Sequence, residues 1–262
     1  FYSTVAPSLK DLPDRSLDKP FSGYDAYHHP IEPLSFYPFS VKPEKKMSVQ
    51  DVIQFQRSVF EGTIYDMTAD TDWLVPDDEG KLVKSPLTTP FPTSHMRQLL
   101  DITWHRNVSK GGYGMVTQLR SWLPDSIGGV YWLYLDNQYV STYVPIYAGV
   151  QEISPYFQTY DPKAYSEDSA RWLIDFVDNL LYLRWQDAME DVRAERDPLE
   201  ASFFANQEEV EKKALDLYRQ SPEKAEAYLT DHTLGAMEKV VELYRKLRDQ
   251  LITAYTNNGE WL

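Results

Sequence analysis

The sequence predicts an α+β fold in which antiparallel strands are followed by long C-terminal helices. Residues 111–147 contain three β-rich runs separated by short turn-forming segments at 124–129 and 136–138, the pattern of an antiparallel meander. From residue 165 the hydrophobic residues recur every three or four positions, as they do on amphipathic helices. A chain of 262 residues, 42% of them hydrophobic, can bury a substantial core.

The composition argues against several classes of protein. A formal net charge of -14 disfavours binding to nucleic acid or to an anionic membrane, because both require clustered lysine and arginine. No apolar run approaches the roughly 20 residues that a membrane span needs. The chain contains no cysteine, so it holds no disulfide, no thiolate metal site and no cysteine nucleophile. It begins with Phe1, so we expect a processed or truncated product, and its compartment, cytoplasmic or exported, is not predicted.

The pattern divides the chain into three parts. We expect residues 1–46 to form an extended arm, since its dense prolines prevent a long helix and its aromatics argue against a loose linker. Residues 47–150 are predicted to contain a helix and the meander, and residues 151–262 a helical region that packs on this core. His28 and His29 in the arm have no third ligand at a recognisable spacing, so no metal site is predicted.

The central part begins with a predicted helix. Ser48 resembles an N-cap with Asp51 at the third position, and an apolar face continues through Phe60 until Gly62 ends the helix. Residues 69–92 are acidic and interrupted by prolines, so we expect a loop with a turn at 77–80. Residues 95–107 are expected to form a short strand, in which His95 and His105 are structural histidines. Pro145 indicates an edge strand or a strand end.

Three helices are predicted after the meander. The first is capped by Ser166 or Asp168 and ends at Pro198, the second covers residues 208–219, and the third begins with Pro222 at its first position. Their apolar stripes are more often core packing than a coiled coil or a partner site, although a homo-oligomer remains open.

One arginine of the meander is a candidate functional residue. Val116, Gln118, Arg120 and Trp122 alternate onto one face of the first β-rich run. A guanidinium on that face needs an anion or a set of carbonyls, because an unpaired buried charge is very costly. Arg120 is either a surface or structurally paired arginine, the more frequent case, or a site arginine. The sequence has no dinucleotide-binding, P-loop, zinc-protease or nucleophile-elbow motif.

Several segments together resemble a known family, the C69 (formerly U34) cysteine dipeptidases of the N-terminal-nucleophile hydrolases. The segments, which cover most of residues 37–190, are YPFSVKPEKK (37–46), SVQDVIQFQRSVFEGTIYDMT (48–68), VTQLRSWLPDSIGGVYWL (116–133), YVPIYAGV (143–150) and ARWLIDFVDNLLYLR (170–184). The resemblance implies a four-layer αββα sandwich, of which this chain looks like the C-terminal half. It also implies that a cysteine at the mature N-terminus attacks the dipeptide amide, with its own α-amine as the base and no cofactor or metal.

The nucleophile would then lie in a partner, the N-terminal half of the same enzyme, and this chain alone would be inactive. The resemblance implies that Arg120 is a catalytic arginine. Gln118 and Trp122 share its face of the strand, so they are candidates to line the dipeptide site. Asp66 is expected either to receive a substrate α-amine or to cap its own loop. Two alternatives remain open: a related amide hydrolase acting on N-acyl amino acids or conjugated bile acids, and a non-catalytic binding or assembly module.

Overall fold

The computed structural model describes residues 43–63, 65–104, 107–109 and 111–256. Nearly all of the expected N-terminal arm lies outside the described residues, and so do His28, His29 and His105. Within the described residues, no helix is long and apolar enough to cross a membrane.

The predicted meander is confirmed as a three-stranded antiparallel sheet in the order β3-β4-β5. Its strands are β3 (Tyr113–Leu119), β4 (Gly129–Leu135) and β5 (Val144–Tyr147), and the short helix α4 (Asp125–Gly128) connects the first two. Val116 lies opposite Trp132, and Trp132 lies opposite Pro145. Pro145 occupies an outer strand of this sheet, as its missing N–H predicts.

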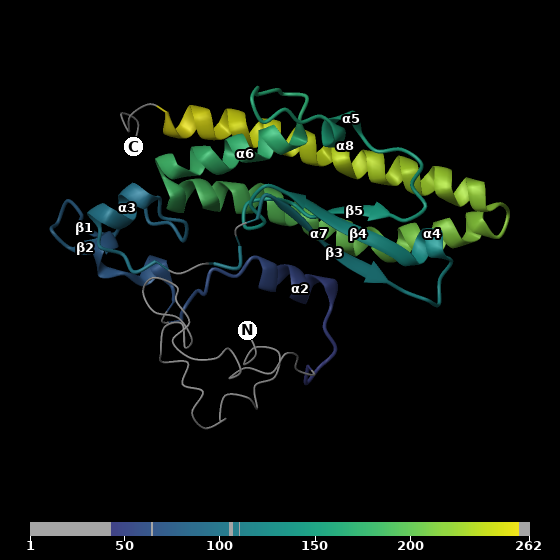
Figure 1. The fold of residues 1–262 in the computed structure, drawn as a ribbon, viewed down its shortest axis with the longest axis horizontal. Coiled ribbons are helices and arrows are strands. Elements are labelled where there is room, and N and C mark those ends of the chain that lie inside the picture. Colours follow the sequence, from purple (N-terminus) through teal and green to yellow (C-terminus); the bar gives the residue numbers. More distant parts are fainter. Residues whose placement is uncertain (1–42, 64, 105–106, 110, 257–262) are drawn as a thin grey trace.

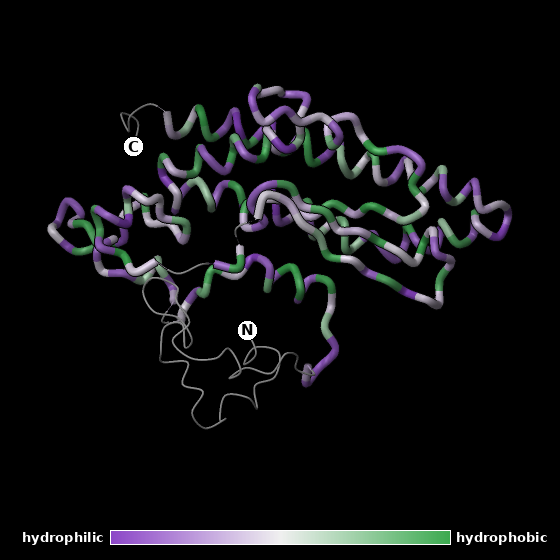
Figure 2. The backbone as a smooth tube through the Cα atoms, viewed as in Figure 1, coloured by the Kyte–Doolittle hydropathy of each residue, from purple (hydrophilic) through white to green (hydrophobic). Residues whose placement is uncertain are grey.

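Long helices cover one side of the sheet, so the α+β fold is confirmed. The helical part consists of α5 (Pro155–Gln158), α6 (Ala170–Leu180), the 3₁₀ turn η5 (Leu181–Leu183), α7 (Trp185–Tyr218) and α8 (Pro222–Tyr255). α7 and α8 lie side by side in opposite directions (Figure 1). Hydrophobic and hydrophilic residues alternate along them with the helical turn (Figure 2).

Two predicted helix boundaries in this region are wrong. α7 continues through Pro198 rather than ending there, and it includes the predicted second helix. Proline lacks the N–H that would reach the carbonyl of Ala194, but the residues on both sides of it pack into one core, which stabilises the continuous helix. α6 is capped by Ser169, whose hydroxyl accepts the N–H of Trp172, and not by Ser166 or Asp168.

The first helix, α2 (Val49–Gln56), has the expected N-terminus and an unexpected end. Ser48 accepts the N–H of Asp51 and the Asp51 carboxylate accepts the N–H of Ser48, which completes a capping box. The prediction that the helix continues to Phe60 is wrong, because it ends at Gln56 with Arg57 as the C-cap. Phe60 has a left-handed backbone with φ of 64°, which no helical residue adopts.

Residues 65–104 form a small projection beside the main body (Figure 1). It contains the 3₁₀ turns η3 (Met67–Ala69) and η4 (Thr71–Trp73), a hairpin of β1 (Leu74–Pro76) and β2 (Leu82–Lys84), and helix α3 (Ser94–Leu99). The turn at 77–80 is confirmed, but it joins two strands rather than lying in a loop. The strand predicted from residue 95 is wrong: Thr93 caps the N–H of Met96 and starts a helix instead.

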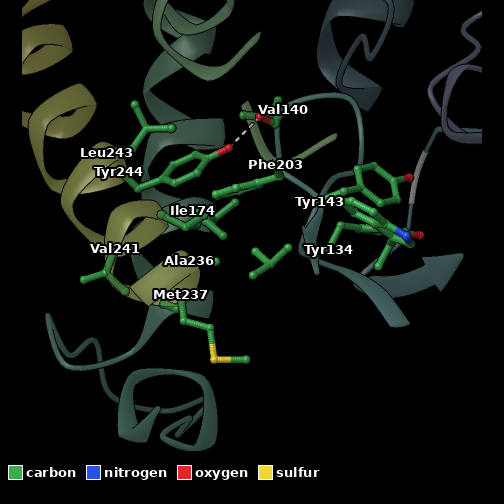
Figure 3. Packing of buried hydrophobic residues seen from close by; sticks show 14 of the residues in the cluster. Tyr134, Val140, Tyr143, Ile174, Phe203, Ala236, Met237, Val241, Leu243 and Tyr244 are labelled. Atoms are coloured by element: carbon green, nitrogen blue, oxygen red, sulfur yellow. Dashed lines mark hydrogen bonds between the residues drawn. The ribbon is translucent and has the colours of Figure 1, made fainter. Parts of the chain in front are cut away.

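One large hydrophobic cluster joins the sheet to the helices, and it runs from Ile53 to Leu251. Trp132 stacks on Phe204 of α7, with ring centroids 4.1 Å apart. Tyr244 of α8 donates its hydroxyl to the carbonyl of Val140 at 2.8 Å (Figure 3). The expected parts 47–150 and 151–262 therefore share a core.

Among the residues that the structure describes, few lie against the other side of the sheet. In β3, Tyr113, Met115 and Leu119 are all exposed and point away from α7, opposite in direction to the buried Val116. Their register partners on β4, Leu135, Leu133 and Gly129, share this side of the sheet. We call this surface, formed by the outward positions of β3 and β4, the outward sheet face.

Candidate functional site

The alternation predicted that Arg120 lies within the first strand. β3 ends at Leu119, so Arg120 instead follows the strand directly. Its guanidinium Nη1 lies 2.6 Å from Oε2 of Glu211 on α7. Nε and Nη2 donate to the carbonyls of Gly128 and Ile127, both at 3.3 Å. The predicted need for an anion and carbonyls is therefore met by a structural carboxylate and the end of α4.

Gln118 belongs to the same polar network. Its Oε1 accepts hydrogen bonds from Trp132 Nε1 at 3.3 Å and from Gln207 Nε2 at 2.8 Å. Gln207 also donates to Glu211, which in turn accepts the hydroxyl of Tyr147. Burial and the nearby Glu211 carboxylate raise the pKa of Tyr147, so this hydroxyl stays protonated as a donor. Gln118 also lines a small cavity of about 350 Å³ beside the N-terminus of α2.

The other two predicted site residues lie apart from this network. Trp122 is 77% exposed in the turn after β3, where the strand alternation no longer applies. Asp66 caps its own loop: its carboxylate accepts the N–H groups of Gly62 and Thr68, both at 2.9 Å, and the hydroxyl of Thr68. Neither residue lines the small cavity or the larger one described next.

A larger cavity of about 930 Å³ lies between α2, the β4–β5 connection and α7, and we call it the α2–α7 cavity. Its lining combines charged and apolar side chains: Gln50, Ile53, Gln54, Phe55, Arg57, Ser58, Glu61, Tyr139, Arg193, Arg196, Asp197, Glu200, Ala201, Phe204 and Ala205. Sequence reasoning missed this cavity, because it ended a helix at Pro198, in the middle of the α7 wall. The run of charges at 193–200 was the available signal.

A buried ion pair forms one wall of the α2–α7 cavity. Arg57 makes two bonds of 2.7 Å to the Glu200 carboxylate and donates to the carbonyls of Gln138 and Ser141. Glu200 also accepts the backbone N–H of Tyr143 at 2.8 Å. Burial alone would lower the pKa of Arg57, but its hydrogen bonds to Glu200 and the attraction of that carboxylate raise it overall. Each guanidinium nitrogen of Arg57 and each carboxylate oxygen of Glu200 thus has a hydrogen-bond partner, and the pair holds the β4–β5 connection in place.

Arg196 is the second buried guanidinium of this wall, with 5% of its surface exposed. It donates to the carbonyl of Tyr139 and to one oxygen of Asp197, whose own side chain is 54% exposed. Burial lowers the pKa of Arg196, and the positive charge of Arg57 lowers it further. Arg196 is thus a cation whose only paired carboxylate among the described residues faces solvent.

Arg193 is an exposed residue that lines the same cavity. Its guanidinium lies over the ring of Tyr139, 5.4 Å from the centroid, and donates to the Tyr139 hydroxyl. Within the described part of the chain, it makes no ion pair with a carboxylate. The described residues also contain no group of three or more His, Cys, Asp or Glu that could hold a metal ion. The lining of the cavity thus presents charged side chains of both signs beside apolar ones.

Comparisons with known proteins agree with the resemblance seen in the sequence. The model of one family, described as "Peptidase family C69", matches residues 26–197. A "Probable dipeptidase B" of Streptococcus pyogenes serotype M1 is 25% identical over 232 residues, which cover 87% of this chain and 43% of the relative. The protein of the same name from serotype M3 (strain SSI-1) is 24% identical over 233 residues. The chain spans less than half the length of these relatives.

Proposed function

Because this chain belongs to peptidase family C69, we propose that it is part of an enzyme that hydrolyses the amide bond of dipeptides. The family match, which extends over about two thirds of the chain, carries this proposal. The names of the similar streptococcal proteins support the same activity. The α2–α7 cavity adds a chemical argument, since its guanidinium and carboxylate groups suit a small zwitterion better than an uncharged acyl chain.

In this proposal the nucleophile comes from outside the chain, which has no cysteine. An N-terminal cysteine attacks the dipeptide carbonyl while its own α-amine takes the thiol proton, and this proton passes to the amine of the C-terminal amino acid as the amide C–N bond breaks. Water then hydrolyses the thioester, which releases the N-terminal amino acid and restores the thiol. This chain supplies cavity walls and the scaffold behind them. A catalytic role for Arg120 stays a prediction, and its contacts give it a supporting role at the end of β3.

The outward sheet face supports the proposal that another part of the enzyme completes the fold. A monomeric protein seldom leaves several large hydrophobic side chains exposed on one face of a sheet. In a four-layer sandwich, a second sheet would pack against this face at a distance of about 10 Å. We infer that the remaining polypeptide, absent from the 262 residues here, provides that second sheet.

The proposal is tested by comparing the complete protein with this chain on a panel of dipeptides, N-acyl amino acids and conjugated bile acids. We expect the complete protein to hydrolyse dipeptides and this chain alone to hydrolyse none of the panel. Alkylation with iodoacetamide should abolish the activity, because the only reactive thiol of the mechanism is the nucleophile. Dipeptide hydrolysis by this chain alone, or activity that survives replacement of the N-terminal cysteine, would contradict the proposal. A preference for N-acyl amino acids or bile acids would favour the related hydrolases.

A further inference from the structure

We propose that Arg193 and Arg196 in the α2–α7 cavity bind the C-terminal carboxylate of the peptide substrate. This inference rests on the proposed dipeptidase function and assigns one end of the substrate to this chain. It concerns a different place from the network of Arg120 and Gln118 that the sequence singled out.

The way in which the charges of the cavity wall are paired points to an anionic ligand beside Arg193 and Arg196. Arg57 and Glu200 neutralise each other through two short hydrogen bonds. Arg196 is almost completely buried, while its neighbour Asp197 is half exposed and therefore screened by water. Arg193 is the third arginine of the wall, and unlike the other two it has no carboxylate partner among the described residues. The lining holds three arginines and three carboxylates, and Glu200 is the buried one of these carboxylates, so Arg193 and Arg196 have no buried anion as a partner among the described residues.

Both arginines retain hydrogen-bond donors for a ligand. A guanidinium carries five N–H groups in a planar fork that matches a carboxylate. Arg196 uses three donor atoms on two acceptors, Tyr139 and Asp197, so N–H groups remain without an acceptor among the described residues. The bond from Arg193 to the Tyr139 hydroxyl and its position over that ring hold the guanidinium without neutralising it.

The rest of the cavity accommodates a short peptide. Its volume of about 930 Å³ is at the upper end of the range of typical small-molecule sites, roughly 300–1,000 Å³. Ile53, Phe204 and Ala201 provide apolar lining for a side chain. Glu61, which also lines the cavity, is an exposed carboxylate that suits the opposite charge of an α-ammonium group.

The test uses the complete protein with Arg193→Gln and compares a free dipeptide with the same dipeptide amidated at its C-terminus. We expect the variant to raise KM for the free dipeptide about tenfold or more, because a charge-assisted hydrogen bond to the carboxylate is lost. kcat for the dipeptide, and both constants for the amide, should stay near wild type. Arg193→Lys, which keeps the charge but not the fork, should restore part of the affinity.

Arg219→Gln is the matched control. Arg219 is an exposed arginine at the end of α7 that pairs only with Asp216 among the described residues. Its replacement should leave KM and kcat unchanged for both the dipeptide and its amide. Calorimetry on complete protein whose nucleophile is replaced by alanine measures the affinity for the dipeptide and for its amide, because neither compound is hydrolysed.

Three results would overturn the inference while leaving the dipeptidase proposal intact. The first is dipeptide hydrolysis with no change in KM or in thermal stability for the Arg193→Gln variant. The second is an equal rise in KM for the dipeptide and its amide. The third is a loss of thermal stability with unchanged KM, which would show that a carboxylate from the remaining polypeptide occupies the cavity. If wild-type protein hydrolyses neither compound and calorimetry detects no dipeptide binding, the proposed function and this inference both fail.

Discussion

Arg57 and Arg120 are neutralised by carboxylates that come from distant parts of the sequence. Arg57 binds Glu200, 143 residues away, and Arg120 binds Glu211, 91 residues away. The sequence predicted that Arg120 needs an anion, because alternation placed it on the buried side. It could not name the partner, since α7 carries many carboxylates and only the packing of α7 on the sheet selects one. For the same reason Arg57 and Arg196 were not recognised as buried.

Asp136 is a further buried charge, and it makes folding stability depend on pH. It has a left-handed backbone with φ of 63°, lies 2.6 Å from Arg171, and has one carboxylate oxygen without a hydrogen-bond partner among the described residues. Burial raises the pKa of Asp136 to about 6, against the opposing effect of Arg171. The folded state therefore binds a proton more tightly than the unfolded state, and the contribution of Asp136 to stability falls as pH rises from about 4 to 6.

We predict that Asp136→Asn removes this dependence, because the amide does not ionise and asparagine tolerates a left-handed backbone. Between pH 4 and pH 7, the unfolding free energy of the variant should rise relative to that of wild type by up to ~3 kcal/mol. Urea titrations across this range measure the difference, with Asp78→Asn as an exposed control. A difference that is independent of pH would show that Asp136 titrates alike in the folded and unfolded states.

At the level of elements, sequence patterns identified the sheet and the helical region but not all of their boundaries. The meander was predictable because strand alternation and turn residues coincide at 111–147. The capping box of α2 was visible in Ser48 and Asp51. The continuation of α7 through Pro198 was not predictable, because tertiary packing outweighs the local effect of one proline. The end of α2 at Gln56 depends on bonds that Arg57 makes to a distant connection.

We predict that Pro198→Ala stabilises the protein by about 1–3 kcal/mol, because alanine restores an N–H to the helix and removes the clash with the carbonyl of Ala194. Pro198 is exposed, so the substitution removes no core contact. The urea midpoint measures the effect, and Glu208→Ala on the exposed side of the same helix should change it little. A lower midpoint for Pro198→Ala would mean that the packing of α7 requires the local distortion that proline produces.

At the level of the whole molecule, the outward sheet face is the surface on which this chain alone should differ from the complete enzyme proposed above. The helix-facing side of the sheet is filled by α7 and α8, so the chain has its own core. The outward side remains apolar and open, as the αββα arrangement implied by the sequence resemblance requires. The sequence could predict this side from alternation in β3, but alternation does not identify what packs against it.

The substitution Leu119→Lys should have different effects in this chain alone and in the complete protein. In this chain alone, the substitution should leave the melting temperature nearly unchanged, because the Leu119 side chain is 76% exposed. In the complete protein, it should strongly reduce activity and lower the melting temperature, since it places a charge between two packed sheets. Leu82→Lys on the projecting hairpin, also at an exposed leucine, serves as the control. Full activity of the Leu119→Lys enzyme would show that the outward sheet face is not an interface.

The long separation between Arg57 and Glu200 also has a consequence for how the chain is made. A ribosome adds roughly 5–20 residues per second, so the time between the synthesis of Arg57 and that of Glu200 is on the order of 10–30 seconds. During that interval the end of α2 and the β4–β5 connection have no carboxylate from α7 to neutralise the guanidinium between them. The nascent sheet also lacks both helices that cover its inner side. The inner side of the sheet therefore stays uncovered until α7 and α8 have been synthesised, and in this period its apolar side chains are most open to aggregation.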